Sequence, residues 1–180
     1  MVILVVGGAG ILGRQVVNCL LENEEKVIVL DNLSIGRIDT DNPSVVFCRM
    51  DIKEERRLEE LFNAFNIDAV IHLGCYFNDL ESLEEPLKYY ENNVGGTITL
   101  LKVMKRHHVQ SLVFSSSVPS EMITPFSESM RMAESILARV DTAHHIKSII
   151  LRQPNALEDD HDVMDLAKTY PLALKVLMER

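Results

Sequence analysis

The chain has 180 residues, enough for one domain with a full core and short for two. Its hydrophobic content is 47%, and the sequence contains no apolar run of membrane-spanning length. A formal net charge of −9 argues against a surface that binds nucleic acid or anionic lipid. We therefore expect one domain over residues 1–180, with neither nucleic acid nor membrane as a partner.

The three cysteines predict a location. Cys19, Cys48 and Cys75 are isolated, odd in number and without the spacing of metal ligands. The N-terminus runs straight into an apolar segment with no basic region ahead of it, so we expect no secretory signal. Together these features predict reduced thiols in a cytoplasmic protein.

The first thirty-four residues read as a strand, a glycine turn, a helix and a second strand. Val2–Val6 is an apolar, β-branched run of the kind found in a strand covered on both faces. Gly7, Gly10 and Gly13 follow it, and a helical pattern starts near Ile11. Glycine permits a tight turn and close approach of a pyrophosphate, while free N–H groups at the start of a helix attract the anion. This context predicts a dinucleotide site.

An acid at the end of the second strand supports this interpretation. The strand expected at 26–30 ends at Asp31, close to the spacing of a ribose-binding acid. A carboxylate there accepts hydrogen bonds from both ribose hydroxyls and repels a 2′-phosphate, which favours NAD over NADP. The alternative is a glycine turn at an ordinary strand–helix junction that binds no ligand.

The rest of the chain continues the alternation of strands and helices. Further strands are expected at 45–48, 69–73, 111–114 and 146–151. Helices are expected at 54–66, 85–107, 126–140 and 163–178, the last interrupted near Pro171. The pattern predicts an α/β fold of the Rossmann type, a doubly wound parallel sheet of about six strands with helices on both faces.

Several motifs carry a resemblance to a known family. They are GGAGILG at the first turn, VIVLDNLSIG at the second strand, MDI at 50–52, VIHLG at 70–74, SLEEPLKYYENNVGGTITLLKVMKRHHVQSLVFSSS at 82–117 and LRQPN at 151–155. In this order and spacing the chain resembles the extended short-chain dehydrogenase/reductases of the NAD-dependent epimerase/dehydratase family, most closely the UDP-glucose 4-epimerases. The resemblance covers nearly the whole chain as far as Asn155.

The resemblance implies a set of residues around NAD. It places Gly7, Gly10, Ile11, Leu12 and Gly13 at the pyrophosphate, Asp31 and Asn32 at the adenine ribose, Asp51 and Ile52 at the adenine, and Leu73, Gly74, Cys75, Asn92 and Ser115 along the rest of the cofactor. It also implies that Asn155 contacts a sugar nucleotide and that Ser117 matches the family's catalytic serine.

The family's catalytic pair is absent from this sequence. The family uses a Tyr-x-x-x-Lys pair, whose tyrosine takes a proton from the sugar hydroxyl while the lysine lowers the tyrosine pKa. Here Phe126 stands at the tyrosine position and Met130 at the lysine position, and no Tyr-x-x-x-Lys occurs anywhere in the chain. Both chemical roles are therefore lost, although side-chain size is kept.

The resemblance also bears on assembly and length. It implies a homodimer formed by the 85–107 and 126–140 helices, whose apolar side chains exceed what one sheet-facing stripe uses: Leu100, Leu101, Val103, Met104, Ile136, Leu137 and Val140. The alternative is that these residues are only that stripe. Relative to the family, we expect the sugar-nucleotide domain to be largely absent.

Acidic residues at 159–162 could suggest a metal site, but we expect them to act as helix caps and expect no metal. Three functions remain open. The favoured one is an NAD-binding, catalytically silent relative of the nucleotide-sugar epimerases, with a possible nucleotide-sugar enzyme as partner. The second is an active epimerase or dehydratase using unconventional residues or a partner chain. The third is an interaction protein that binds no nucleotide.

Overall fold

The computed structural model describes residues 1–36, 42–117, 122–153 and 160–179. Its strands all belong to one parallel sheet: β1 (Val2–Val6), β2 (Lys26–Asp31), β3 (Val45–Arg49), β4 (Ala69–His72), β5 (Ser111–Ser117) and β6 (Lys147–Gln153). The helical segments are α1 (Ile11–Glu22), α2 (Glu55–Ala64), α3 (Asp79–Glu84), α4 (Pro86–Tyr89), the π-helix η1 (Tyr90–Gly96), α5 (Thr97–Arg106), α6 (Pro125–His144) and α7 (Asp160–Met178).

The sheet has the strand order β3-β2-β1-β4-β5-β6. The chain first builds outward from β1 to β3 and then returns to the other side of β1 for β4, so the order reverses between β1 and β4. Val6 lies opposite Leu30 on one side and His72 on the other, and the three strands therefore end at the same edge. Open parallel sheets bind their ligands outside the strand ends at such a reversal.

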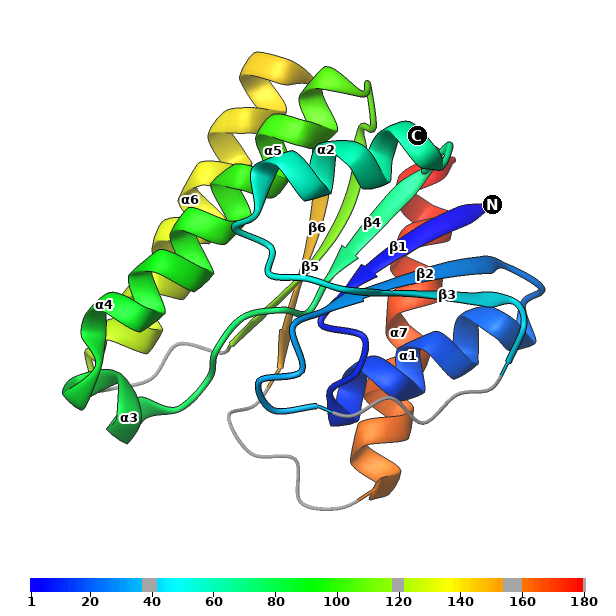
Figure 1. Ribbon diagram of the computed structural model, residues 1–180. Helices are drawn as coiled ribbons and strands as arrows, with labels where there is room; N and C mark the ends of the chain where they lie inside the picture. Colours follow the sequence, from blue (N-terminus) through cyan, green and yellow to red (C-terminus); the bar gives the residue numbers. More distant parts are fainter. Residues whose placement is uncertain (37–41, 118–121, 154–159, 180) are drawn as a thin grey trace.

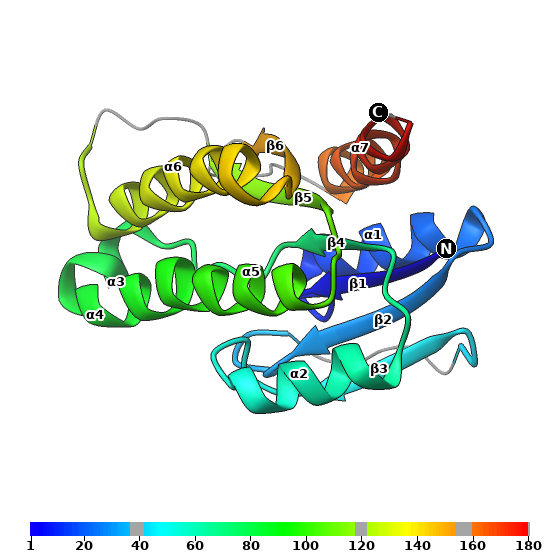
Figure 2. The same cartoon turned by 90° about the horizontal axis from the view of Figure 1, so that it is seen from above.

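Two apolar cores cover the two faces of the sheet (Figures 1 and 2). One core joins the sheet to α2, α5 and α6 through side chains such as Leu58, Leu100 and Leu137. The other joins it to α1 and α7, with Val16 and Leu174 among its members. The predicted Rossmann-type, doubly wound sheet of six strands is confirmed.

The helix expected over 85–107 has a different structure. It is divided into α4, the π-helix η1 and α5, and the short helix α3 precedes it unpredicted. A π-helix uses the wider i→i+5 hydrogen bond and is found most often at functional sites. Here it lies where Gly96 passes so close to Ile52 that an added Cβ would meet the Ile52 Cγ2 at 2.5 Å. The apolar stripe of the sequence does not reveal such a change of pitch.

The interruption expected at Pro171 is also wrong. α7 is continuous through this proline, although proline removes one backbone hydrogen bond. The helix is held by its buried face, which includes Val163, Ala167, Tyr170, Leu174 and Leu177. Tertiary packing therefore overrides the local preference.

The apolar residues that suggested a dimer are largely used within the single chain. Leu100, Val103 and Met104 are fully buried in the core beneath α5, and Leu137 is buried beneath α6. Ile136 and Val140 pack against the same core while keeping part of their surface exposed. These side chains therefore behave mainly as the sheet-facing stripe that was the alternative. Within the described parts of the chain, no helix is long and apolar enough to cross a membrane.

Candidate functional site

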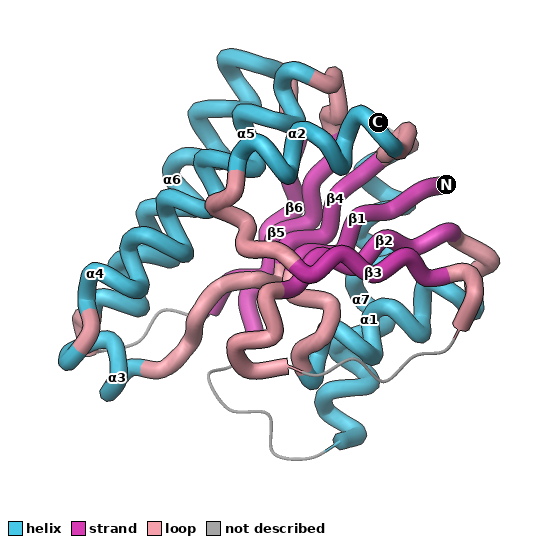
Figure 3. The backbone as a smooth tube through the Cα atoms, viewed as in Figure 1, coloured by secondary structure: helices cyan, strands magenta, loops and turns pink. Residues whose placement is uncertain are grey.

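A cavity of about 740 Å³ opens at the carboxyl ends of the strands, beside the reversal between β1 and β4. The loops that follow β1, β2 and β4 converge there (Figure 3). Of the residues expected at the cofactor, the cavity is lined by Gly7, Gly10, Ile11, Leu12, Gly13, Asp31, Asn32, Ile52, Gly74, Cys75, Asn92 and Ser115. Ser117, Phe126 and Met130 line it as well.

The three glycines of the first turn differ in why, and whether, the fold requires a glycine at that position. Gly7 has φ +79°, and a Cβ there would come within 2.7 Å of the Gly74 backbone. A Cβ on Gly13 would lie 2.3 Å from the Gly7 carbonyl oxygen. Gly10 is different, because its φ of −68° suits any residue and a Cβ would meet only the Gly7 oxygen, at 3.5 Å. The fold therefore requires Gly7 and Gly13, whereas the backbone at Gly10 would accept a side chain and borders the cavity.

The first backbone N–H groups of α1 point toward the open space at Gly10. The N-cap is Gly10, no side chain caps it, and the first turn contains no acidic residue. The first N–H groups of an α-helix have no partner within the helix. Together with the positive end of the helix dipole they suit a phosphate group. The cavity therefore offers an anion site, built from backbone, beside the open space at Gly10.

Asp31 ends β2 and is about 9% exposed at the cavity wall. Its Oδ2 accepts from the Ala9 N–H at 3.0 Å and its Oδ1 from the Leu33 N–H at 2.7 Å. An ionised carboxylate has about four acceptor positions, so two remain for ligand hydroxyls. The two backbone donors fix the orientation of the carboxylate toward the cavity.

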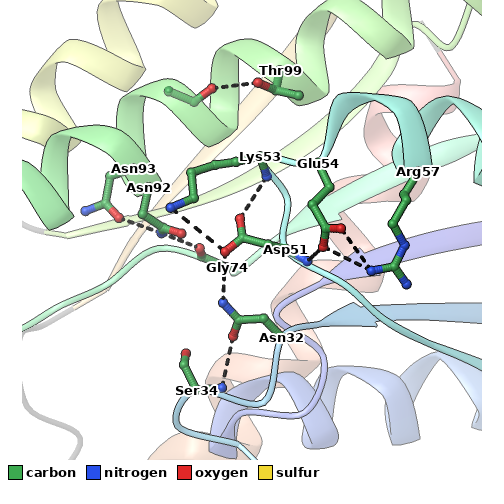
Figure 4. Close-up of polar contacts among 11 residues, drawn as sticks. Asn32, Ser34, Asp51, Lys53, Glu54, Arg57, Gly74, Asn92, Asn93 and Thr99 are labelled. Carbon is green, nitrogen blue, oxygen red and sulfur yellow. Dashed lines mark hydrogen bonds and ion pairs between the residues drawn. The ribbon is translucent and has the colours of Figure 1, made fainter.

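Asn32 and Asp51 link the β2 loop to the β3 loop (Figure 4). The Asn32 Nδ2 donates to the Asp51 Oδ2 at 3.4 Å, and the Asp51 Oδ1 accepts from the Lys53 N–H at 2.9 Å. Asp51 is not among the cavity-lining residues, whereas its neighbours Met50 and Ile52 are. A contact of Asp51 with adenine therefore remains a prediction.

The π-helix η1 holds the loop that follows β4. The Asn92 Nδ2 donates to the Gly74 carbonyl at 2.9 Å, as Figure 4 shows. The Asn93 side chain accepts from the Tyr76 N–H at 2.8 Å and donates to the Tyr76 carbonyl at 2.9 Å. Two successive asparagines thus bind the same loop, which the wider turn of η1 allows. Leu73 belongs to this loop but is not among the residues that line the cavity.

His72 supports the same loop from below. Its Nδ1 accepts from the Gly74 N–H at 3.2 Å, so in the neutral ring the Nε2 carries the hydrogen and donates to the Thr97 Oγ1 at 3.1 Å. Thr97 in turn donates to the Asn93 carbonyl at 2.6 Å. Burial lowers the His72 pKa to about 4, which keeps the ring neutral.

The three serines at the end of β5 have different partners. The Ser115 Oγ accepts from the Tyr170 hydroxyl at 2.9 Å and also from the Gln153 amide. The Ser116 Oγ donates to Glu134 at 2.7 Å. Ser117 is half-buried and lines the cavity. These contacts tie Ser115 and Ser116 to the protein itself.

Glu134 is held in turn by Arg152 of β6. The Arg152 Nε and Nη2 donate to its two oxygens at 3.0 and 2.6 Å. These hydrogen bonds hold the Glu134 pKa below its usual value. The result is an ionic link that joins β5, α6 and β6 behind Ser116.

Phe126 and Met130, which the family resemblance matches to the catalytic tyrosine and lysine, both line the cavity. A capping box starts α6, in which the Thr124 Oγ1 accepts from the Ser127 N–H at 3.1 Å and the Ser127 Oγ accepts from the Thr124 N–H at 2.9 Å. This start places Phe126 and Met130 one turn apart, each 4% exposed, at the cavity. Neither side chain can transfer a proton or carry a charge.

Three other reactive side chains lie near this wall. Burial raises the Cys75 pKa to about 12, so its thiol does not supply a nucleophile near neutral pH. Tyr76 lines the cavity, and the Lys88 Nζ lies 4.7 Å from the centre of its ring. Glu128 is not among the cavity-lining residues, and its Oε2 accepts a hydrogen bond from the Tyr90 hydroxyl at 2.8 Å.

Some predicted residues lie elsewhere, and some cavity residues had not been predicted. Asn155 falls outside the described residues. In the part of the chain that is described, no cluster of His, Cys, Asp or Glu could hold a metal ion. The unpredicted lining residues include Ile35, Gly36, Tyr76, Asp79 and Gln153. Only Gln153 could have been identified, because it is the last residue of the strand β6, whereas the others lie in loops and helix starts.

Comparisons with known proteins agree with this geometry. The model of the NAD dependent epimerase/dehydratase family matches residues 3–158. The UDP-glucose 4-epimerase of Lacticaseibacillus casei is 35% identical over 170 residues, which cover 86% of this chain and 51% of that protein. The enzyme of the same name from Halalkalibacterium halodurans is 37% identical over 175 residues, covering 89% and 52%. The chain spans about half the length of the curated relatives it matches.

Solved structures give the same result. The UDP-glucose 4-epimerase of Thermus thermophilus in complex with NAD has a TM-score of 0.79 at 29% identity, with coverage of 84% of this chain and 54% of that one. The Brucella ovis enzyme in complex with NAD has a TM-score of 0.78 at 34% identity, covering 84% and 51%. A further UDP-glucose 4-epimerase structure reaches 0.88 at 25% identity and covers 99% of this chain. The predicted family is confirmed, and the Thermus thermophilus and Brucella ovis enzymes were solved with NAD bound.

Proposed function

The chain belongs to the NAD dependent epimerase/dehydratase family, and from this premise we propose that it binds NAD in the described cavity without catalysing epimerisation. Binding is supported by the backbone donors at the start of α1, the open space at Gly10 and the oriented carboxylate of Asp31. A carboxylate at this position favours NAD over NADP, because a 2′-phosphate would be repelled.

The observation that carries the catalytic silence is the pair Phe126 and Met130. Both line the cavity, so the positions of the family's proton-transferring hydroxyl and its ammonium are filled by a phenyl ring and a thioether. Neither group exchanges a proton, so the family's transfer from a sugar hydroxyl lacks its usual acceptor and its usual ammonium. In family members, bound NAD supplies the hydride chemistry. This chain would still bind NAD, but it would lack the tyrosine that exchanges the proton.

Incubation with NAD and either UDP-glucose or UDP-galactose tests this proposal. We expect neither interconversion of the sugars nor a rise of absorbance from reduced cofactor. Sustained turnover above a no-protein control would overturn the silent function. A parallel titration with NADP should give weaker binding than NAD, and equal affinities would contradict the role of Asp31.

A second function, an active epimerase or dehydratase with unconventional residues or a partner chain, is favoured by one observation. Tyr76 lines the cavity and has the Lys88 ammonium over its ring, so a phenol and a cation are present together. Lys88 is also paired with Glu81, however, and the Tyr76 ring packs on Tyr89 with their centres 5.9 Å apart. If turnover is found, Tyr76→Phe should abolish it, and the control Tyr90→Phe should not.

Partners are part of the proposal. A silent NAD-binding chain could serve as a cofactor-dependent partner of a nucleotide-sugar enzyme, and the family resemblance suggests a homodimer through the 85–107 and 126–140 helices. The partly exposed Ile136 and Val140 are available for such a contact. Light scattering at micromolar concentration should then give twice the monomer mass, and a monomer would remove the dimer from the proposal. The three free cysteines accord with the expected cytoplasmic location, which stays a prediction.

A further inference from the structure

The cavity has an unbalanced set of charges. Among its lining residues that the structure describes, the charged side chains are Asp31 and Asp79, and none is a lysine, arginine or histidine. The family lysine that would have supplied a cation is Met130 here. This imbalance affects whether the cavity prefers oxidised NAD or NADH, a question that rests on the proposed function of NAD binding.

The preference of the cavity for oxidised NAD or NADH depends on the part of the cofactor whose charge differs between the two forms. The oxidised and reduced forms share the adenosine and the pyrophosphate, so the α1 donors and Asp31 hold both in the same way. The forms differ in the nicotinamide ring, which carries a positive charge when oxidised and none when reduced. Each negative side chain near the ring therefore favours the oxidised form, and each positive one favours the reduced form.

The nicotinamide half of a bound NAD would lie in the part of the cavity next to β4 and β5, across the point where the strand order reverses. A dinucleotide spans the crevice at the reversal of the strand order, so with adenosine at β2 the other half lies toward β4 and β5. That part of the cavity is lined by Tyr76, Asp79, Ser117, Phe126 and Met130. The aromatic rings present electron-rich faces, which attract cations.

Asp79 is fixed beside this wall. Its Oδ1 accepts from the Thr124 hydroxyl at 2.6 Å, and Thr124 caps the helix that carries Phe126 and Met130. The nearby cations are already paired, since Arg152 binds Glu134 and Lys88 binds Glu81. Arg131 follows Met130 but is exposed and is not a lining residue. Among the residues that the structure describes, the uncompensated charge at this end of the cavity is therefore negative.

We propose that the cavity selects oxidised NAD over NADH, because Asp79 and the aromatic wall favour the charged nicotinamide ring where Met130 has removed the opposing cation. The chain would then report on the oxidised cofactor. The selection also has a redox consequence, since each tenfold preference for the oxidised form lowers the midpoint potential of the bound two-electron couple by about 30 mV. Bound NAD becomes a weaker hydride acceptor, in keeping with a silent site.

Calorimetric titration of the full chain with NAD and with NADH tests the selection. We expect the oxidised form to bind at least about fivefold more tightly. Met130→Lys should shift the ratio of the two dissociation constants about tenfold toward NADH, and the neutral control Met130→Leu should leave it unchanged. Asp79→Asn keeps the acceptor for Thr124 and should shift the ratio in the same direction by about threefold.

The outcomes separate the two proposals. Equal affinities, or tighter binding of NADH by the natural chain, would overturn the selection while leaving NAD binding intact. An unchanged ratio in Asp79→Asn and Met130→Lys would overturn its electrostatic cause. Absence of heat with both forms would overturn the proposed function, and the selection with it. If Met130→Lys fails to fold in a thermal scan, Asp79→Asn still decides the matter.

Discussion

The two ends of the cavity differ in how their polar groups are used. At the β1–α1–β2 end, the α1 donors, the space at Gly10 and part of the Asp31 carboxylate remain available to a ligand. At the β5–α6 end, Ser115 and Ser116 are bound to other side chains, and Phe126 and Met130 are apolar. The groups suited to a dinucleotide and the positions that the resemblance assigns to proton transfer thus lie on separate elements, so one set can change without the other.

Glycine substitutions within the first turn should give the largest effect. Gly13→Ala would place a Cβ 2.3 Å from a backbone oxygen, and we expect it to lower the free energy of unfolding by at least about 3 kcal/mol. Gly10→Ala should change this free energy by less than about 0.5 kcal/mol, because the Cβ meets open space, yet weaken NAD binding more than about tenfold. Denaturant unfolding and calorimetry measure the two quantities. Equal loss of stability in both variants would contradict the separate roles of these glycines.

The pH dependence of stability should reveal the support beneath the β4 loop. The His72 pKa is about 4 when folded and about 6.5 when unfolded, so the unfolded chain binds the extra proton between these values. Stability is therefore full above pH 6.5 and falls as the pH drops toward 4, by about 3 kcal/mol in total.

Denaturant unfolding between about pH 7.5 and 4 measures this loss. Carboxylates also titrate in the window, so His72→Gln is the comparison, and it should lose less stability than the natural chain over the same range. The exposed His145→Gln is the control and should follow the natural chain. Parallel curves for His72→Gln and the natural chain would remove His72 as the cause.

Occupation of the cavity should stabilise the whole domain. At an NAD concentration of one hundred times the dissociation constant, mass action raises the free energy of unfolding by about 2.7 kcal/mol. Thermal unfolding with and without NAD measures the rise. Asp31→Ala is the matched variant, and its melting temperature should respond less to NAD. The same response in both proteins would show that Asp31 does not contact the ligand.

The ionic link at the β5–α6 end should give the smallest effect. Arg152→Met leaves the partly buried Glu134 with Ser116 alone and should cost about 1–2 kcal/mol. The exposed Arg139→Met on the same helix as Glu134 should cost less than about 0.5 kcal/mol. Denaturant unfolding distinguishes the variants, and NAD affinity should be unchanged in both. A loss of affinity in Arg152→Met would show that the two ends of the cavity are coupled.

The sequence predicts the end of the cavity made by local motifs better than the end made by tertiary contacts. Val2–Val6 and the glycine spacing give β1, the turn and α1 directly, since strand, turn and helix start follow one another along the chain. The π-helix could not be predicted, because the apolar stripe does not reveal a change of helical pitch, and the close approach of Gly96 to Ile52 joins residues forty-four positions apart in sequence. The hydrogen bonds of Ser115 to Tyr170 and Gln153 depend on packing in the same way.

Phe126 is an apolar residue whose position in the cavity wall is also predicted from the sequence. Its place follows from the resemblance to the family's Tyr-x-x-x-Lys pattern, and Phe126 lines the cavity in the structure. Pro171 shows the opposite case, because a local rule predicted a break that the buried face of α7 prevents.

Calorimetric titration of the purified chain with NAD, followed by addition of UDP-glucose to the saturated protein, decides whether the cavity holds the cofactor and leaves it unused. We predict a saturable heat with one NAD per chain, and then neither UDP-galactose nor reduced cofactor after prolonged incubation. Absence of the first heat would contradict NAD binding, and product in the second step would contradict a cavity that holds the cofactor without using it.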